Sequence, residues 1–310
     1  MKKKEKNELE DEDEFYADSN LMLEGKSEKQ DKKEKKKEEE EKEKKEKKLD
    51  KLTKRRILVN FWRTSLHGEK IGIRQKDQQR AKSRHFSKDM EIFGEVRFED
   101  KKAGVIGFRT KEWMGFNLEN GKLPRLVIRY FNENGNWEGS IEQDTIQGLM
   151  LSTAYKEDIP IFRIFISGNR HIFTMQKLEK SAGSDEVILP IILEKAGKKM
   201  VCVAFDRRRL TMGTDWRVFL LSDHDRTIAD LDSKKLDIGG KTYINIYDPT
   251  LIENKTFVNS LILFTALIKF WDQVKKSLKE AYKKYRKNEF EFKPSHNEIE
   301  LLENPRGYRT

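Results

Sequence analysis

The apolar run FVNSLILFTALIKFW, residues 257–271, constrains the fold more than any other segment. At about 3.6 residues per turn, its apolar side chains cannot all lie on one face of a helix. Such a helix must be surrounded by protein or by lipid. A membrane-spanning helix needs about 20 predominantly apolar residues, whereas this run is shorter and contains Asn259 and Lys269. We therefore expect a buried core helix, with a membrane span as the alternative.

The segments before this helix are typical of β-strands. Runs rich in β-branched and aromatic residues recur every 8–15 residues, with turn residues such as Asn-Glu-Asn-Gly at 132–135 between them. Segments 92–118 and 145–178 fit only as generic strands. This spacing favours an antiparallel all-β architecture, either a barrel or a sandwich. The expected strands are 92–98, 104–110, 125–131, 136–142, 160–166, 171–178, 186–193, 199–205, 216–221, 227–231 and 241–247.

The combination of these strands with one apolar helix indicates a closed barrel. A barrel of about twelve strands leaves an interior that side chains alone cannot fill. A helix about 10 Å across would occupy that space. We predict a mainly β fold, an antiparallel barrel of about twelve strands around a buried C-terminal hydrophobic helix. This central helix is expected at about 257–287, and a charged tail precedes the barrel.

Charge divides the chain into segments. Residues 1–25 carry a net charge of −5 and residues 26–51 carry +3, against +10 for the whole chain, which leaves +12 for residues 52–310. Residues 28–51 are almost entirely Lys and Glu without an apolar stripe, so we expect a disordered tail or a solvated single helix. The predicted domains are a tail over 1–51, a basic linker over 52–90, the barrel over 91–290 and a C-terminal tail over 291–310.

The strongly basic folded part favours polyanionic partners, namely anionic lipid, nucleic acid or acidic protein. One candidate site is a run of three arginines between two strands, because guanidinium groups bind phosphates through paired hydrogen bonds. The alternative is an ordinary solvated basic loop. The three residues are Arg207, Arg208 and Arg209.

The continuation of the last helix is the second candidate site. Past Trp271 the pattern becomes amphipathic, with an apolar face that includes Val274 and Leu278 and a polar face rich in lysine. A basic amphipathic helix is suited to an anionic membrane or to a phosphate backbone. The alternative is a helix packed on the barrel with solvated lysines. The candidate lysines are Lys275, Lys276, Lys279, Lys283 and Lys284.

The C-terminal third resembles the tubby C-terminal, LURP-one-related and phospholipid scramblase superfamily. The resemblance runs from Asp215 to Trp271 and consists of the hairpin WRVFLLSDHDRTIADLD, the strand KKLDIGGKTYINIYD and the helix NSLILFTALIKFW. It implies a twelve-stranded barrel around a central helix, and contact with membranes. The chain differs from scramblases because it lacks a cysteine cluster and a proline-rich N-terminus, and a basic stretch follows its helix. Lipid binding is therefore expected more than lipid movement.

No catalytic motif stands out, so we expect a binding protein without a cofactor or metal, and an enzyme with an unrecognised site remains the alternative. Asp223, His224 and Asp225 fall in a predicted turn, where aspartate is common. The single cysteine, Cys202, lies in an apolar run, and the N-terminus lacks the apolar core of a secretory signal. We expect a cytoplasmic protein that associates peripherally with anionic lipid, or alternatively one that binds nucleic acid.

Overall fold

The computed structural model describes residues 53–61, 79–80, 82–83, 85–114, 118–178, 185–193, 199–207, 215–233 and 240–304. The chain forms two units, 1–53 and 54–310. All of the described residues except Thr53 belong to the second unit. The charged tail predicted over 1–51 lies outside the described residues.

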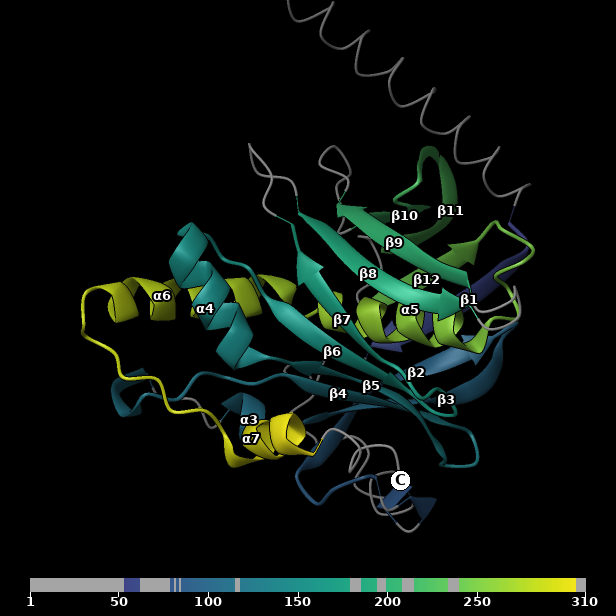
Figure 1. Ribbon diagram of the computed structural model, residues 1–310. Coiled ribbons are helices and arrows are strands. Elements are labelled where there is room, and N and C mark those ends of the chain that lie inside the picture. The colour runs from purple at the N-terminus through teal and green to yellow at the C-terminus, as the bar shows by residue number, and fades with distance from the viewer. Residues whose placement is uncertain are drawn as a thin grey trace, which may run out of the picture. The chain divides into compact units, whose positions relative to one another are not determined.

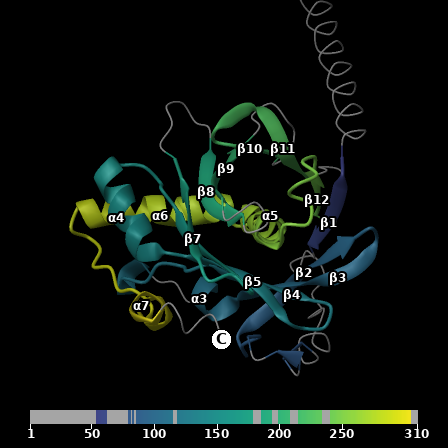
Figure 2. The same ribbon diagram turned by 45° about the vertical axis from the view of Figure 1, so that its right-hand side comes forward.

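Twelve antiparallel strands form a closed barrel, in which consecutive strands pair and β1 closes the ring against β12 (Figures 1 and 2). The eleven expected strands correspond to β2–β12, so the predicted fold class is confirmed. The strands are β1 (Arg55–Phe61), β2 (Met90–Phe98), β3 (Lys101–Arg109), β4 (Val127–Asn132), β5 (Trp137–Gln143), β6 (Ile161–Ile166), β7 (Ile172–Lys177), β8 (Glu186–Leu193), β9 (Lys199–Arg207), β10 (Trp216–Leu220), β11 (Asp223–Ser233) and β12 (Lys241–Ile246).

Strand β1 differs from the predicted basic linker over 52–90. Ile57, Val59 and Phe61 alternate into the core with exposures of 0, 0 and 5%, as one face of a half-buried strand does. The neighbouring basic residues concealed this alternation. Arg56 instead lies outside the core, where its Nε donates to Asn245 Oδ1 on β12 at 2.8 Å. The barrel therefore begins at Arg55.

Helix α5 (Lys255–Ile268) occupies the barrel interior, and its residues from Thr256 to Leu267 are all buried. Its side chains belong to the same apolar cluster as the inward-facing residues of the strands. The ring of Phe264 lies 4.1 Å from that of Phe205 and 5.1 Å from that of Trp216, edge to face. Asn254 caps the helix by accepting a hydrogen bond from the backbone N–H of Phe257 at 2.9 Å.

The single central helix predicted over 257–287 is broken. Helix α5 ends at Ile268, and α6 (Trp271–Arg286) continues at an angle of 65°. The ring of Phe270 packs among Phe93, Phe108 and Trp113, at centroid distances of 5.3–5.5 Å. The ring of Trp271 instead packs against Trp216 at 5.8 Å. Two adjacent aromatic residues held by different groups of rings account for the bend.

Outside the barrel, the described residues form the helices α3 (Thr110–Met114), α4 (Thr145–Tyr155) and α7 (His296–Glu303) and the short turn η1 (Leu118–Asn120). The expectation of generic strands over 92–118 and 145–178 is therefore wrong at α3 and α4. Asp144 caps α4 by accepting from Gln147 N at 3.0 Å. Residues 291–310 were predicted to be a C-terminal tail, but they include helix α7.

Helices α5 and α6 also bear on the alternative of a membrane span. Among the described residues, no single helix is long and apolar enough to cross a membrane. The bent pair α5 and α6 together meets those criteria by length and composition. In the folded chain, however, α5 is enclosed by the barrel.

Candidate functional site

Helix α6 leaves the barrel interior beside α4 and projects beyond the strands (Figure 1). Most of its apolar face is covered by the protein itself. Leu278, Ala281 and Tyr282 are buried in a cluster that includes Leu149 of α4 and Phe290. The hydroxyl of Tyr282 donates to the backbone carbonyl of Lys156 at the end of α4, at 3.0 Å. These three residues are therefore not available to enter a membrane, whereas Tyr285 on the same face is 46% exposed.

The opposite face of α6 is basic and exposed. Lys276, Lys279, Lys283 and Arg286, which together form the basic face, are all exposed, and none forms an ion pair with another described residue. At about 100° per residue these four positions fall within an arc of about 80°, and they span about 15 Å along the helix. Asp272, one turn before Lys276, falls within the same arc, and Glu280 lies about 40° outside it. These four residues of the basic face are spaced by three, four and three positions in the sequence, which is the signal that could identify a common helix face. Arg286 was not among the candidate residues predicted from the sequence.

Two other residues of the predicted binding site, Lys275 and Arg207, take part in one cluster of ion pairs within the protein. Lys275 Nζ lies 2.7 Å from Asp185 Oδ2 and 3.4 Å from Asp272 Oδ1. Arg207 Nη1 lies 3.3 Å and 3.2 Å from the same two oxygens. Trp271 Nε1 also donates to Asp185 Oδ2 at 3.0 Å. Arg207 and Lys275 therefore hold the start of α6 against β8 and β9.

The pKa of Asp185 reflects this cluster. Burial by itself raises the pKa of a carboxyl group, but the hydrogen bond and charge of Lys275, with Trp271 and Lys177, lower it overall. Asp185 is thus an ionised anchor at the end of the barrel from which α6 emerges. Of the other predicted residues, Lys284 is only half-buried on α6, and Arg208 and Arg209 lie outside the described residues.

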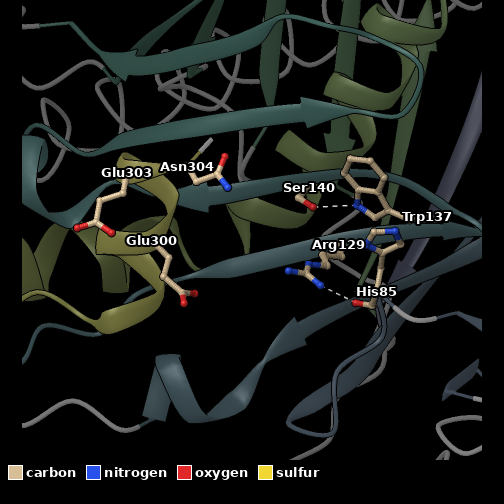
Figure 3. Close-up of a pocket in the computed structure, with 7 residues that line it drawn as sticks. All are labelled: His85, Arg129, Trp137, Ser140, Glu300, Glu303 and Asn304. Carbon is tan, nitrogen blue, oxygen red and sulfur yellow. Dashed lines mark hydrogen bonds between the residues drawn. The ribbon is translucent and has the colours of Figure 1, made fainter. Parts of the chain in front are cut away.

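A second feature is a hollow of about 590 Å³ on the outer face of β4 and β5 (Figure 3). Trp137 Nε1 donates to Ser140 Oγ at 2.9 Å, and the Trp137 ring lies 5.2 Å from that of His85. Arg129 donates to the backbone carbonyl of His85. No sequence pattern indicated this hollow, because its walls come from distant segments. The lining residues are His85, Arg129, Trp137, Ser140, Glu300, Glu303 and Asn304.

Beneath the first turn of α7, charged groups are buried against the outer face of the barrel. Arg125, which is 1% exposed, has Nη2 at 2.7 Å from Glu142 Oε2 and Nη1 at 2.5 Å from Glu112 Oε2. Asn297 of α7 donates to Glu112 Oε1 at 2.9 Å. Glu142 Oε1 has no hydrogen-bond partner in the described part of the chain. No local sequence pattern indicated that these charges would be buried.

The basic face of α6 is exposed, and its side chains have the chemistry to bind negatively charged groups. Within the described ranges, no group of three or more His, Cys, Asp or Glu side chains is placed to hold a metal ion. No family model matches the sequence, and neither a curated protein nor a solved structure matches the chain.

Proposed function

We propose that this protein is a non-enzymatic adaptor that associates peripherally with anionic membrane lipid through the basic face of α6. The observation that carries the proposal is the concentration of Lys276, Lys279, Lys283 and Arg286 on one exposed side of a helix. Each basic residue near an anionic membrane contributes about 1 kcal/mol of attraction, which falls off within a Debye length. Four such residues supply reversible binding at moderate salt.

The mode of binding follows from the covered apolar face. An interfacial helix normally inserts its apolar side among the acyl chains, but Leu278 and Tyr282 of α6 are packed against the protein. The basic face therefore meets lipid head groups electrostatically, without insertion. We infer that binding depends steeply on salt and on the fraction of anionic lipid, and little on acyl-chain packing.

The closed barrel around α5 supports kinship with the tubby, LURP-one-related and scramblase superfamily, which we propose on the resemblance over residues 215–271. Membrane-binding adaptors within that superfamily are consistent with a lipid-binding adaptor function. The corresponding location is the cytoplasmic surface of a membrane, where anionic lipids are concentrated.

Charge reversal of the basic face tests the proposal. The triple variant Lys276→Glu, Lys279→Glu, Lys283→Glu should lose at least about a hundredfold in partitioning to vesicles of mixed phosphatidylserine and phosphatidylcholine. The measurement is co-sedimentation at several salt concentrations. Lys275 is left intact because a glutamate there would face Asp185.

The matched control changes charge by the same amount elsewhere. Lys88, Lys101 and Lys122 are exposed and form no ion pair with another described residue, so the variant carrying glutamate at all three should keep most of its binding. Equal loss in both triple variants would mean that only net charge matters. No binding of the wild-type protein to anionic vesicles would refute the proposed function.

Nucleic-acid binding is the second candidate, and the absence of an insertable apolar face on α6 favours it. A straight basic helix about 15 Å long is suited to contact several phosphates of a duplex. A labelled-DNA titration beside the vesicle assay separates the two. Tighter binding to DNA than to vesicles, with a steep salt dependence that the basic-face variant reduces, would select this alternative.

A further inference from the structure

The barrel has an open mouth at the end where α5 begins, opposite the end from which α6 emerges. A hollow of about 350 Å³ lies there, between the first turn of α5 and the near ends of β1 to β5. This volume is within the range of small-molecule pockets, about 300–1,000 Å³, and barrel mouths are common places for them. Its apolar wall is formed by Phe98, Ala103, Ile252 and Val258.

Tyr130 is a buried residue whose side chain borders this hollow. The residue is 3% exposed and lines the hollow, and its hydroxyl has no hydrogen-bond partner among the described residues. Gly104 leaves room for the ring, because a Cβ atom there would lie 2.7 Å from Tyr130 Cε2.

Tyr130 lies close to charged residues at the rim of the mouth. Burial raises the pKa of Tyr130, and the charges that act on it most are those of Glu138 and Arg55, both of which line the hollow. The phenol therefore remains protonated at neutral pH and is available to donate a hydrogen bond. An occupant that brings an acceptor to this position satisfies it.

The rim carries two basic and two acidic side chains, Arg55, Lys255, Glu138 and Glu253, and Arg55 supplies the donors for an anion. Arg55 donates through Nη1 to the carbonyl of Ile252 and stacks on Phe98 at 4.6 Å, which leaves its other nitrogens without a hydrogen bond in the described part of the chain. The carboxylate of Glu138 is already satisfied, by Lys255 at 2.7 Å and by Asn132 at 2.7 Å. Glu253 is 70% exposed and lies 3.9 Å from Arg55.

The start of α5 adds to this preference. The N-terminal end of a helix carries a partial positive charge, which favours an anion nearby. Val258 and Asn259, in the first turns of the 14-residue helix α5, line the hollow. Donors and positive charge thus converge on one side of the hollow, and apolar side chains form the other.

We propose that the barrel mouth binds a small organic carboxylate with a hydrocarbon body. Its carboxylate accepts hydrogen bonds from the Tyr130 hydroxyl and from the free nitrogens of Arg55. Its hydrocarbon body packs on Phe98, Ala103, Ile252 and Val258. This site lies at the other end of the barrel from the basic face of α6 and does not depend on lipid binding there.

Calorimetric titration of the full-length protein with sodium octanoate tests the proposal, with 1-octanol and inorganic phosphate as comparison ligands. Octanoate should bind at least about tenfold more tightly than 1-octanol, because only the carboxylate pairs with the donors of the mouth. Phosphate alone should bind weakly, since it lacks the apolar body. Equal affinity for octanoate and 1-octanol, or no binding of octanoate, would overturn the proposal.

The variant Tyr130→Phe isolates the hydroxyl. It should weaken octanoate binding about tenfold while leaving the melting temperature of the free protein unchanged or higher, because the group it removes has no partner among the described residues. Tyr282→Phe is the matched control, since it removes a hydroxyl that donates to Lys156 O at 3.0 Å. The control should melt lower but bind octanoate as the wild type does. Unchanged octanoate binding by Tyr130→Phe would refute the assignment.

Discussion

The inner and outer faces of the barrel wall are covered in opposite ways. Inside, α5 is packed by apolar side chains, with Leu261, Leu263 and Phe264 each 0% exposed. Outside, α3 and α7 cover β4 and β5 through charged groups, and Arg125 and Glu142 are each 1% exposed. The first interface is held by non-directional burial and the second by hydrogen-bonded charge pairs.

The two interfaces therefore respond differently to substitution. Apolar packing tolerates changes that conserve volume and shape, whereas a buried ion pair is stable only while both partners are present. The inner interface therefore provides most of the stability of the barrel. The outer interface fixes where α3 and α7 sit, because Glu112, Arg125 and Asn297 must meet in one geometry.

The largest expected effect comes from a charge placed in the inner interface. Leu263→Asp should prevent folding, because an unpaired carboxylate would be buried against apolar side chains. Leu263→Ala should fold but lose about 2–5 kcal/mol. Circular dichroism and thermal melting measure both. Met150→Asp is the control, since Met150 is 66% exposed on α4, and native melting of Leu263→Asp would contradict the central-helix packing.

Breaking the outer interface should have the next largest effect. Arg125→Met leaves Glu142 and Glu112 without their shared partner and should cost about 3–5 kcal/mol in denaturant unfolding. Arg226→Met removes a similar pair with Asp248, at 2.8 Å, but Arg226 is 60% exposed, so its cost should stay below about 1 kcal/mol.

A double variant sharpens this test. Arg125→Met with Glu142→Leu should recover part of the stability that Arg125→Met loses. It removes a buried carboxylate that would otherwise face only Arg129, at 3.8 Å, among the described residues, whereas Glu112 keeps its ion pair with Arg109. Equal stability of Arg125→Met and the wild type would mean that the charge pairs do not hold the outer interface together.

The smallest expected effect is a pH dependence carried by Glu298 of α7. Its carboxylate, 1% exposed, accepts from the backbone N–H of Ile146 at 3.1 Å and from Thr145. Burial is the main cause that raises the pKa of Glu298 above its ordinary value of 4.5. The folded state then binds the proton more tightly than the unfolded state, so this contribution to stability falls as the pH rises above about 4.5.

The measurement is the unfolding free energy of the wild type and of Glu298→Gln across that pH range. As the pH rises, the wild type should lose stability relative to the variant. Asp185→Asn is the opposite case, because the pKa of Asp185 is lowered and its contribution to stability is lost as the pH falls below its ordinary value of 3.8. A difference between wild type and Glu298→Gln that does not change with pH would contradict a raised pKa for Glu298.

Part of the candidate site was foreseeable from sequence. The lysines of α6 follow a helical spacing, so their common exposed face could be inferred from residue numbers alone. The ion pairs of Arg207 and Lys275 could not be inferred in this way, because their shared partner Asp185 lies 22 and 90 residues away in the chain. The barrel mouth at Tyr130 and the hollow beside Trp137 likewise join segments that no local pattern relates.

The local sequence pattern was enough to predict a barrel, with a sandwich and a membrane span as the alternatives. Alternation of apolar residues and turn chemistry marks eleven strands, and an apolar run without a polar face requires a helix enclosed by them, because both signals arise from local periodicity and burial. Three further features follow from contacts between residues far apart in the chain. These contacts made Arg55–Phe61 the closing strand, bent the last helix between Phe270 and Trp271, and buried Arg125 beside Glu142. Each of these depends on a partner distant in the chain, and a charged residue carries no local sign of whether that partner will be water or another side chain.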